Sequence, residues 1–293
     1  MPEIGEKRIN AGPSFSGIMK ATVLVILILT FGFIAAAGCT AASHSPAPAT
    51  TTIVQSTTPA ITTPQETRAH YVVGVDADFP PFTSIDSAGN FSGFDIEVAR
   101  SIAAREGFDV SFVAVPWDSA ISSLESKQID LIWSGVTISP ERSARVNFST
   151  PYYRVNQSIA IREGSGFTLQ DFNTGKLRIG AQTGSTEAEW VQVNLVGTGI
   201  MPASNLTLSP DIATLAGNLV NGTVDAVLIQ EPTLADTIKG KPLIMIGKTG
   251  AQDSYAVAIR KNDTALQATL DHGLALLMND PSWQALKAKY GLS

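Results

Sequence analysis

The feature of this sequence that most limits its fold is an alternation of short β-type runs with helical segments, which occurs twice after residue 70. Strands are predicted at 71–75, 110–115, 129–134, 177–181 and 224–229. Helices are predicted between them at 95–106, 119–125, about 186–195 and about 210–221. Alternating strands and helices build parallel sheets that are covered on both faces. Because the pattern occurs twice, we expect an α/β fold of two lobes with a cleft between them.

Polar residues collect immediately after the predicted strands. In open α/β sheets, ligands bind outside the carboxyl ends of the strands, so these residues are expected to meet in the cleft. They are Asp76, Ser134, Gly135, Thr137, Gln182, Ser185, Thr186 and Gln230. The pattern favours reversible binding of a small polar solute.

Three further side chains near the strand ends suit a small zwitterion. Arg142 can hold a carboxylate with two parallel hydrogen bonds, which Lys cannot do as specifically. Phe79 and Trp117 can flank a ligand side chain and attract it by cation–π contact if it is cationic. The alternatives are a surface salt bridge for Arg142 and ordinary core packing for the two aromatic residues.

The composition argues against several other functions. A net charge of −6 does not suit nucleic acid, because phosphate binding needs an excess of Lys and Arg. One cysteine excludes a disulfide scaffold, and the three histidines, His44, His70 and His272, lack metal-ligand spacing. We therefore expect no metal, no cofactor and no enzyme activity.

The N-terminal part of the chain has the pattern of an export signal. Residues 21–38 carry no charge, follow Met19-Lys20 and end in small residues, which predicts a signal peptide over 1–38 with Met19 as an alternative start. The string at 36–39, AAGC, resembles a lipobox, with Ala36 where Leu is more usual, and predicts lipidation of Cys39. The alternative is a retained membrane helix.

The next stretch, 39–69, is rich in Thr, Ser and Pro and is expected to be a solvated stalk. With either form of the N-terminal segment, the globular part lies outside the cytoplasm and is tethered to the outer face of the cytoplasmic membrane.

Residues 71–293 resemble the family 3 extracellular solute-binding proteins of ABC importers, which bind polar amino acids. The most specific motif is GFDIEV at 93–98, which continues with Ile102 and Ala103. It departs from the family signature only at the end of the signature, where Glu106 stands in place of an apolar residue. Supporting strings are VDADFPPF (75–82), SGVTISPER (134–142), NFSTPYY (147–153), GAQTGST (180–186), VDAVLIQEP (224–232) and WQALKAKYG (283–291).

The resemblance implies two Rossmann-like lobes with mixed central sheets, joined by a two-strand hinge, as in type II periplasmic binding proteins. Lobe 1 is expected at 70–158 and 258–293, lobe 2 at 162–254, and the hinge at 158–161 and 255–259. It also implies a monomer that closes around a small-molecule ligand and is recognised by a membrane permease.

The resemblance also implies a role for each candidate site residue. Arg142, Thr137 and the Thr186 backbone would hold the ligand carboxylate. The carbonyl of Ser134 or Gly135 would accept from the ammonium. Phe79 and Trp117 would flank the side chain, and its polar end would lie near Asp76, Gln182 and Ser185.

Position 230 departs from the family pattern. The family usually places Asp there to pair with the ammonium, and this chain has Gln230, which carries no charge. A buried ammonium without an anionic partner is costly. Either Glu231, Asp76 or Asp78 supplies the charge, or the ligand is not a standard α-amino acid.

Two other functions fit the same scaffold, because a fold alone does not determine activity. One is an enzyme similar to prephenate or arogenate dehydratases, with Glu187 or Glu231 as the acid. The other is an extracellular sensor domain.

Overall fold

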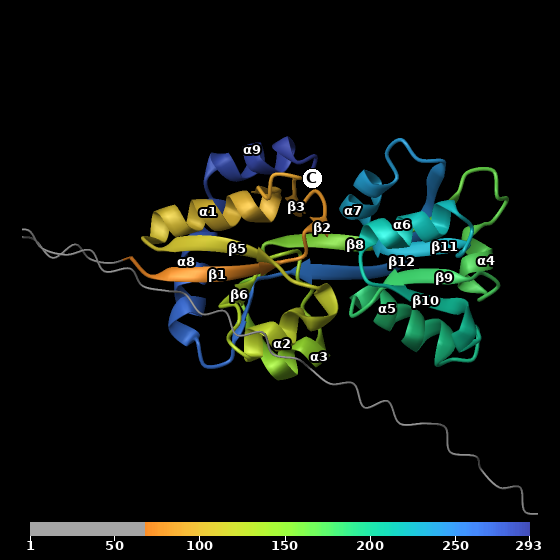
Figure 1. Ribbon diagram of the computed structural model, residues 1–293, viewed down its shortest axis with the longest axis horizontal. Coiled ribbons are helices and arrows are strands. Elements are labelled where there is room, and N and C mark those ends of the chain that lie inside the picture. The colour runs from red at the N-terminus through yellow and green to blue at the C-terminus, as the bar shows by residue number, and fades with distance from the viewer. Residues whose placement is uncertain (1–67) are drawn as a thin grey trace, which may run out of the picture. The chain divides into compact units, whose positions relative to one another are not determined.

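The computed structural model describes residues 68–293 (Figure 1). The predicted signal peptide, Cys39 and all but the last two residues of the predicted stalk lie outside the described residues. Within 68–293, none of the helices combines the length and the apolar character needed to cross a membrane.

The first lobe is built on a five-stranded sheet in the order β5-β1-β6-β13-β7. Its strands are β5 (Asp109–Ala114), β1 (His70–Val75), β6 (Leu131–Ile132), β13 (Ala258–Arg260) and β7 (Val146–Phe148). β1 pairs in parallel with β5 and β6, and β13 runs antiparallel to both of its neighbours. A small sheet, β2 (Asp78–Phe79), β3 (Thr83–Ile85) and β4 (Phe91–Ser92), belongs to the same lobe.

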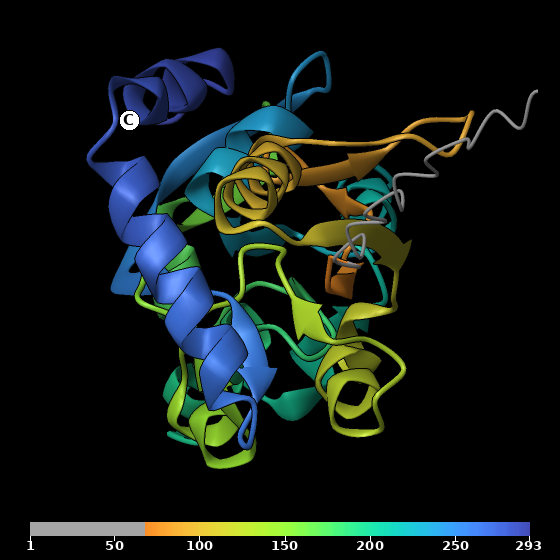
Figure 2. The same ribbon diagram turned by 90° about the vertical axis from the view of Figure 1, so that its left-hand side faces the viewer.

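Helices complete the first lobe. They are α1 (Phe94–Glu106), α2 (Ala120–Glu125), α3 (Pro140–Arg145), α8 (Thr264–Met278) and α9 (Pro281–Lys289), with a 3-10 turn at Trp117–Ser119. Figure 2 shows α8 and α9, in blue, together on one side of this lobe. Leu266, Leu270, Leu274 and Leu277 on one face of α8 are all buried, as is Trp283 of α9. This apolar stripe holds the C-terminal helices against the rest of the lobe.

The second lobe is built on another five-stranded sheet, in the order β10-β9-β11-β8-β12. Its strands are β10 (Leu206–Ser209), β9 (Ile179–Gln182), β11 (Ala226–Gln230), β8 (Tyr153–Arg162) and β12 (Leu243–Tyr255). β9 pairs in parallel with β10 and β11, whereas β8 runs antiparallel to β11 and β12. Its helices are α4 (Leu169–Asn173), α5 (Thr186–Val191), α6 (Ile212–Val220) and α7 (Glu231–Thr237). A π-helical turn at 192–196 and a 3-10 turn at 203–205 follow α5.

The predicted fold class is confirmed: the chain forms an α/β fold with two lobes and mixed central sheets. The strand predicted at 129–134 shortens to β6, because the chain turns directly after Ile132 into a loop with a left-handed Gly135. The helix predicted at about 186–195 becomes α5 and the π-helical turn.

Two segments pass from one sheet to the other, at 149–152 and at 256–257. They run side by side: the Ser149 amide donates to the Val257 carbonyl at 2.9 Å, and the Tyr152 amide donates to the Tyr255 carbonyl at 2.9 Å. The predicted hinge segment 255–259 includes the second crossing. The other predicted segment, 158–161, lies within the second sheet, where it pairs with β11 and β12.

Candidate ligand-binding site

A small cavity lies between the two lobes, and ten of the eleven predicted site residues line it. They are Asp76, Phe79, Trp117, Ser134, Gly135, Thr137, Arg142, Gln182, Ser185 and Gln230. The lobes are closed on it, so it has room for little more than a water molecule. Thr186 does not line this cavity; its hydroxyl donates to Asp253 Oδ2 at 3.3 Å.

The strand ends explain why these residues meet. Asp76 directly follows β1, and Ser134 lies two residues after β6, so both lie at the carboxyl edge of the first sheet. Gln182 ends β9 and Gln230 ends β11, at the carboxyl edge of the second sheet. The two edges face each other across the cavity, as expected for a ligand site in open α/β sheets.

Asp76 joins the two lobes. Its Oδ2 accepts a hydrogen bond of 2.8 Å from Gln182 Nε2, and its Oδ1 accepts one of 3.0 Å from the Asp78 amide. Burial raises the pKa of the Asp76 carboxyl, and these two donors act in the opposite direction. Its backbone is fixed by Ser134, whose hydroxyl accepts from the Asp76 amide at 3.0 Å.

The loop after β6 is held in place by Asp95, from the GFDIEV motif. Asp95 Oδ2 accepts from the Gly135 amide at 2.7 Å and from the Tyr152 hydroxyl at 2.8 Å. Complete burial raises the pKa of Asp95 to about 7, and these two donors lower it. Gly135 has φ of 55°, and a Cβ there would lie 2.6 Å from Phe79 and 2.9 Å from Tyr255. The site loop therefore depends on a buried carboxyl and on a glycine.

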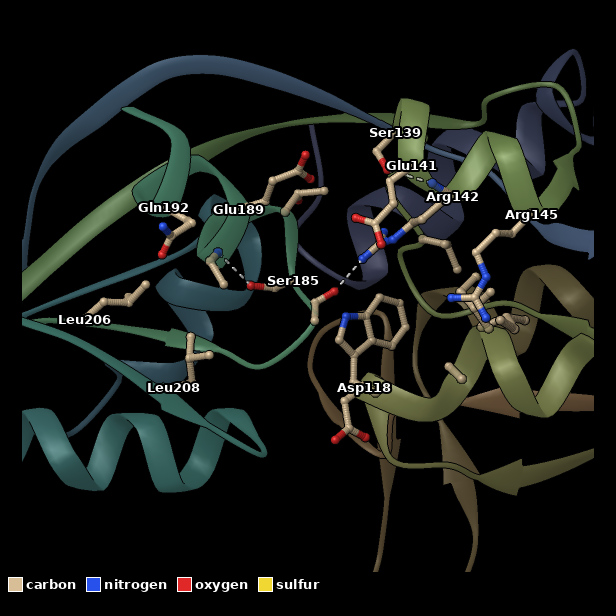
Figure 3. Close-up of a pocket in the computed structure, with 18 residues that line it drawn as sticks. Asp118, Ser139, Glu141, Arg142, Arg145, Ser185, Glu189, Gln192, Leu206 and Leu208 are labelled. Carbon is tan, nitrogen blue, oxygen red and sulfur yellow. Dashed lines mark hydrogen bonds between the residues drawn. The ribbon is translucent and has the colours of Figure 1, made fainter. Parts of the chain in front are cut away.

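Arg142 extends from α3 across the cleft (Figure 3). Its guanidinium donates to the Thr137 carbonyl at 2.9 Å and to the Gly184 carbonyl in the second lobe at 3.0 Å, and it lies 5.2 Å from the Trp117 ring centre. Burial lowers the pKa of Arg142, and Glu187 and Asp253 oppose this effect. Within residues 68–293 Arg142 makes no salt bridge, so the surface-pair alternative does not describe it.

A second, wider pocket adjoins the cavity and shares Trp117, Arg142 and Ser185 with it (Figure 3). Side chains of both lobes line it, among them the half-exposed Leu208. The two predicted aromatic walls therefore differ. Phe79 is buried and stacks on Phe82, whereas Trp117 separates the cavity from the open cleft.

The structure adds polar groups that the sequence did not assign to binding. Glu187, in the first turn of α5, is 1% exposed, and its Oε1 has no hydrogen-bond partner. Burial, and to a lesser extent the negative charge of Asp253, raises the pKa of Glu187 to about 8. Asp253 of β12 accepts from Gln157 Nε2 at 3.1 Å, and burial raises its pKa. Gln157 and Asp253 are middle-strand residues without a motif, so no sequence signal marked them.

Two of the acidic residues that were expected to supply a negative charge opposite the ligand ammonium have other partners. The Glu231 carboxylate accepts from Lys248 at 2.8 Å and from Asn156 at 3.1 Å, and Glu231 does not line the cavity. Asp78 Oδ2 accepts from the Ala213 amide in the second lobe at 2.6 Å. The described residues contain no group of three or more His, Cys, Asp or Glu side chains placed to hold a metal ion.

Comparisons with known proteins agree with this architecture. Residues 71–293 match the bacterial extracellular solute-binding proteins, family 3, and the chain belongs to that family. The arginine-binding extracellular protein ArtP of Bacillus subtilis (strain 168) is 38% identical over 226 residues, which cover 75% of this chain and 85% of that protein.

Two further proteins are similar to this chain over most of their own length. The L-cystine-binding protein TcyJ of Escherichia coli (strain K12) is 29% identical, over 76% of this chain and 83% of its own. The structure of an ancestral arginine-binding protein bound to arginine is 28% identical and superposes with a TM-score of 0.70, covering 76% of this chain and 98% of the other.

Proposed function

We propose that this protein is the substrate-binding component of an ABC importer and that it captures an α-amino acid between its two lobes. The observation that carries the proposal is the position of Arg142. Its guanidinium lies at the cavity wall, over Trp117, and contacts backbone carbonyls in both lobes. A ligand carboxylate that takes two of its N–H groups would tie the lobes together through a charge-assisted pair.

The roles of the other residues are those that the family resemblance implies, and all of these residues except Thr186 line the cavity. Thr137 and the Thr186 backbone assist Arg142 with the carboxylate, and the carbonyl of Ser134 or Gly135 accepts from the ammonium. Phe79 and Trp117 flank the ligand side chain. Thr137 supports this assignment, because its buried hydroxyl has no partner without a ligand.

We propose a cationic amino acid, with L-arginine as the first candidate. Asp76 lines the cavity, and its negative charge suits a cationic side chain once the ligand takes the place of Gln182 as donor. The relatives named for arginine agree with this choice, whereas the one named for cystine favours a neutral ligand.

Binding requires the lobes to open and close, because the closed cavity has no room for an amino acid. We propose that the first lobe (70–148 and 258–293) and the second lobe (153–255) rotate about the paired crossing segments and that ligand shifts the population toward the closed form. A permease that recognises the closed form then receives the solute.

Cell-surface attachment belongs to the same proposal. Cleavage before Cys39 and lipidation of that residue would leave the lobes on the stalk, as a monomer at the outer face of the membrane. Mass spectrometry of the mature N-terminus tests this point, and a free, unmodified Cys39 contradicts it.

Calorimetry against the twenty L-amino acids tests the function itself. We expect at least one to bind tighter than millimolar, with L-arginine among the strongest. If none binds at millimolar concentration, the proposal is wrong.

A dehydratase-like activity is the second candidate, and Glu187 is the residue that favours it. Glu187 lies two residues after the cavity residue Ser185, although it lines neither pocket itself, and a buried carboxyl with a pKa of about 8 has the protonation state of a general acid near neutral pH. Conversion of prephenate by the purified protein would establish this function, and we expect no turnover.

A further inference from the structure

The site lacks an obvious anion for the ammonium of an amino acid. Gln230 is 7% exposed at the end of β11, lines the cavity and carries no charge. Glu231, the next residue, is held by Lys248 and Asn156. Asp76 and Asp78 have donors from the second lobe, Gln182 and the Ala213 amide.

Glu187, in the first turn of α5, is a buried acidic residue that can supply the missing negative charge. The helix α5, which carries Glu187, packs against β11, which ends at Gln230, and the Gln230 side chain lowers the pKa of the Glu187 carboxyl. Glu187 is 1% exposed, and its Oε1 has no partner. A buried carboxyl oxygen without a hydrogen-bond donor is costly, so a positive group brought close to Glu187 would stabilise its carboxylate.

Charged and titratable groups face Glu187 from the elements packed around α5. Arg142 of α3 acts on it as a positive charge, and Asp253 of β12 acts as a negative one. Tyr255, also of β12, is buried, and its hydroxyl has no partner. Glu187 and Asp253 together exceed the charge of Arg142 by one unit when both are ionised. One additional cation would therefore balance the cluster in its fully ionised state.

We infer that Glu187, acting through the Gln230 amide, supplies the negative charge that pairs with the ammonium of the ligand. In this arrangement the Gln230 carbonyl oxygen accepts from the ammonium and its N–H donates to Glu187. The negative charge that family members usually carry on Asp at position 230 thus lies on Glu187, behind Gln230. The inference rests on the proposed function, and Glu187 is a positioning residue.

The test compares L-arginine with 5-guanidinopentanoate, which is arginine without its α-ammonium, by calorimetry of the full chain at pH 7. We expect the Glu187→Gln variant to bind L-arginine about 10- to 100-fold more weakly and to bind 5-guanidinopentanoate unchanged. The double variant Glu187→Gln/Gln230→Asp, which returns the carboxylate to the wall, is expected to recover most of the loss. Glu163→Gln, which removes an exposed carboxylate of the second lobe that lines neither pocket, is the control.

A second readout separates this role from a merely structural one. If Glu187 is protonated without ligand and ionised beside the ammonium, wild-type protein releases up to one proton on binding L-arginine at pH 7. Titrations in phosphate and Tris buffers measure this release, which should vanish in Glu187→Gln.

The outcomes are distinct. If wild type and Glu187→Gln prefer L-arginine over 5-guanidinopentanoate by the same factor, the inference is wrong and the proposed function stands. The same holds if proton release persists in the variant. Failure of the wild-type protein to bind L-arginine overturns the proposed ligand and the inference with it.

Discussion

The Asp78 carboxylate in the first lobe accepts a hydrogen bond of 2.6 Å from the Ala213 amide, in the first turn of α6 in the second lobe. Asp78 itself does not line the cavity. The contact therefore joins the lobes beside the ligand rather than through it. Within residues 68–293, it is one of three side-chain hydrogen bonds that join the lobes, together with Asp76–Gln182 and Arg142–Gly184.

Removal of the Asp78 carboxylate should favour the open form. In Asp78→Ala, we expect ligand affinity to fall about threefold to tenfold, because a partly exposed hydrogen bond to a charged group is worth on the order of 1 kcal/mol. Small-angle X-ray scattering of the ligand-free protein should show a larger radius of gyration than wild type. Asp236→Ala, which removes a half-exposed carboxylate at the end of α7 that pairs with Lys239 just beyond the helix, should change neither quantity. An unchanged radius together with unchanged affinity contradicts a role for Asp78 in closure.

The two lobes and most of the site could be predicted from the sequence for one physical reason. Strand ends are encoded locally, by apolar runs followed by polar residues, and parallel sheets bring those ends to one edge. Asp76, Gln182 and Gln230 were found in this way. The GFDIEV motif pointed to the family, and the structure shows what Asp95 does there: it fixes the Gly135 amide.

The contacts across the cleft could not be predicted, because they join residues far apart in sequence without a shared pattern. The sequence indicated Glu187 only as a possible catalytic acid and not as a ligand-binding group, and Asp253 looked like a polar residue in a strand. The charge of Arg142 acts on both carboxyls from the other lobe, which only the closed arrangement shows. For the same reason, the sequence placed one hinge segment at 158–161, whereas the chain passes between the sheets at 149–152.

Arg142 should be the side chain whose loss most weakens binding of a carboxylate ligand. Arg142→Ala removes a partly buried charged donor, so we expect a loss of about 3 kcal/mol or more, roughly 100-fold in affinity. Arg142→Lys should recover only part of it, because an ammonium cannot donate two parallel hydrogen bonds.

The matched control for Arg142 lies on the same helix. Arg145, three residues further along α3, pairs with Glu125 at the surface. Calorimetry of Arg145→Ala is expected to give wild-type affinity within about a factor of two. If Arg142→Ala binds as well as Arg145→Ala, Arg142 does not contact the ligand.

Gly135 should tolerate no side chain. Gly135→Ala adds a Cβ that lies 2.6 Å from Phe79 and 2.9 Å from Tyr255, in addition to the cost of a left-handed backbone. Gly107→Ala has a similar left-handed φ of 78° and meets nothing within 4 Å, so it isolates the backbone cost of about 1 kcal/mol. We expect urea unfolding to show at least about 1 kcal/mol more destabilisation at Gly135 than at Gly107, with loss of ligand binding only at Gly135. Equal destabilisation at both positions would mean that the site loop is free to move.

Glu187 should make the ligand-free protein less stable as the pH rises. Its pKa in the folded protein is about 8, above the ordinary value of 4.5, so the folded state binds more protons than the unfolded state between these values. The free energy of unfolding therefore falls through this window, by at most about 1.4 kcal/mol per pH unit from this group. Asp95 adds to the fall below about pH 7, since its pKa is also raised. Urea unfolding at pH 5, 6, 7 and 8 should give a shallower slope for Glu187→Gln than for wild type, and an unchanged slope for Glu163→Gln. Parallel curves for wild type and Glu187→Gln would show that Glu187 is ionised in the closed, ligand-free protein.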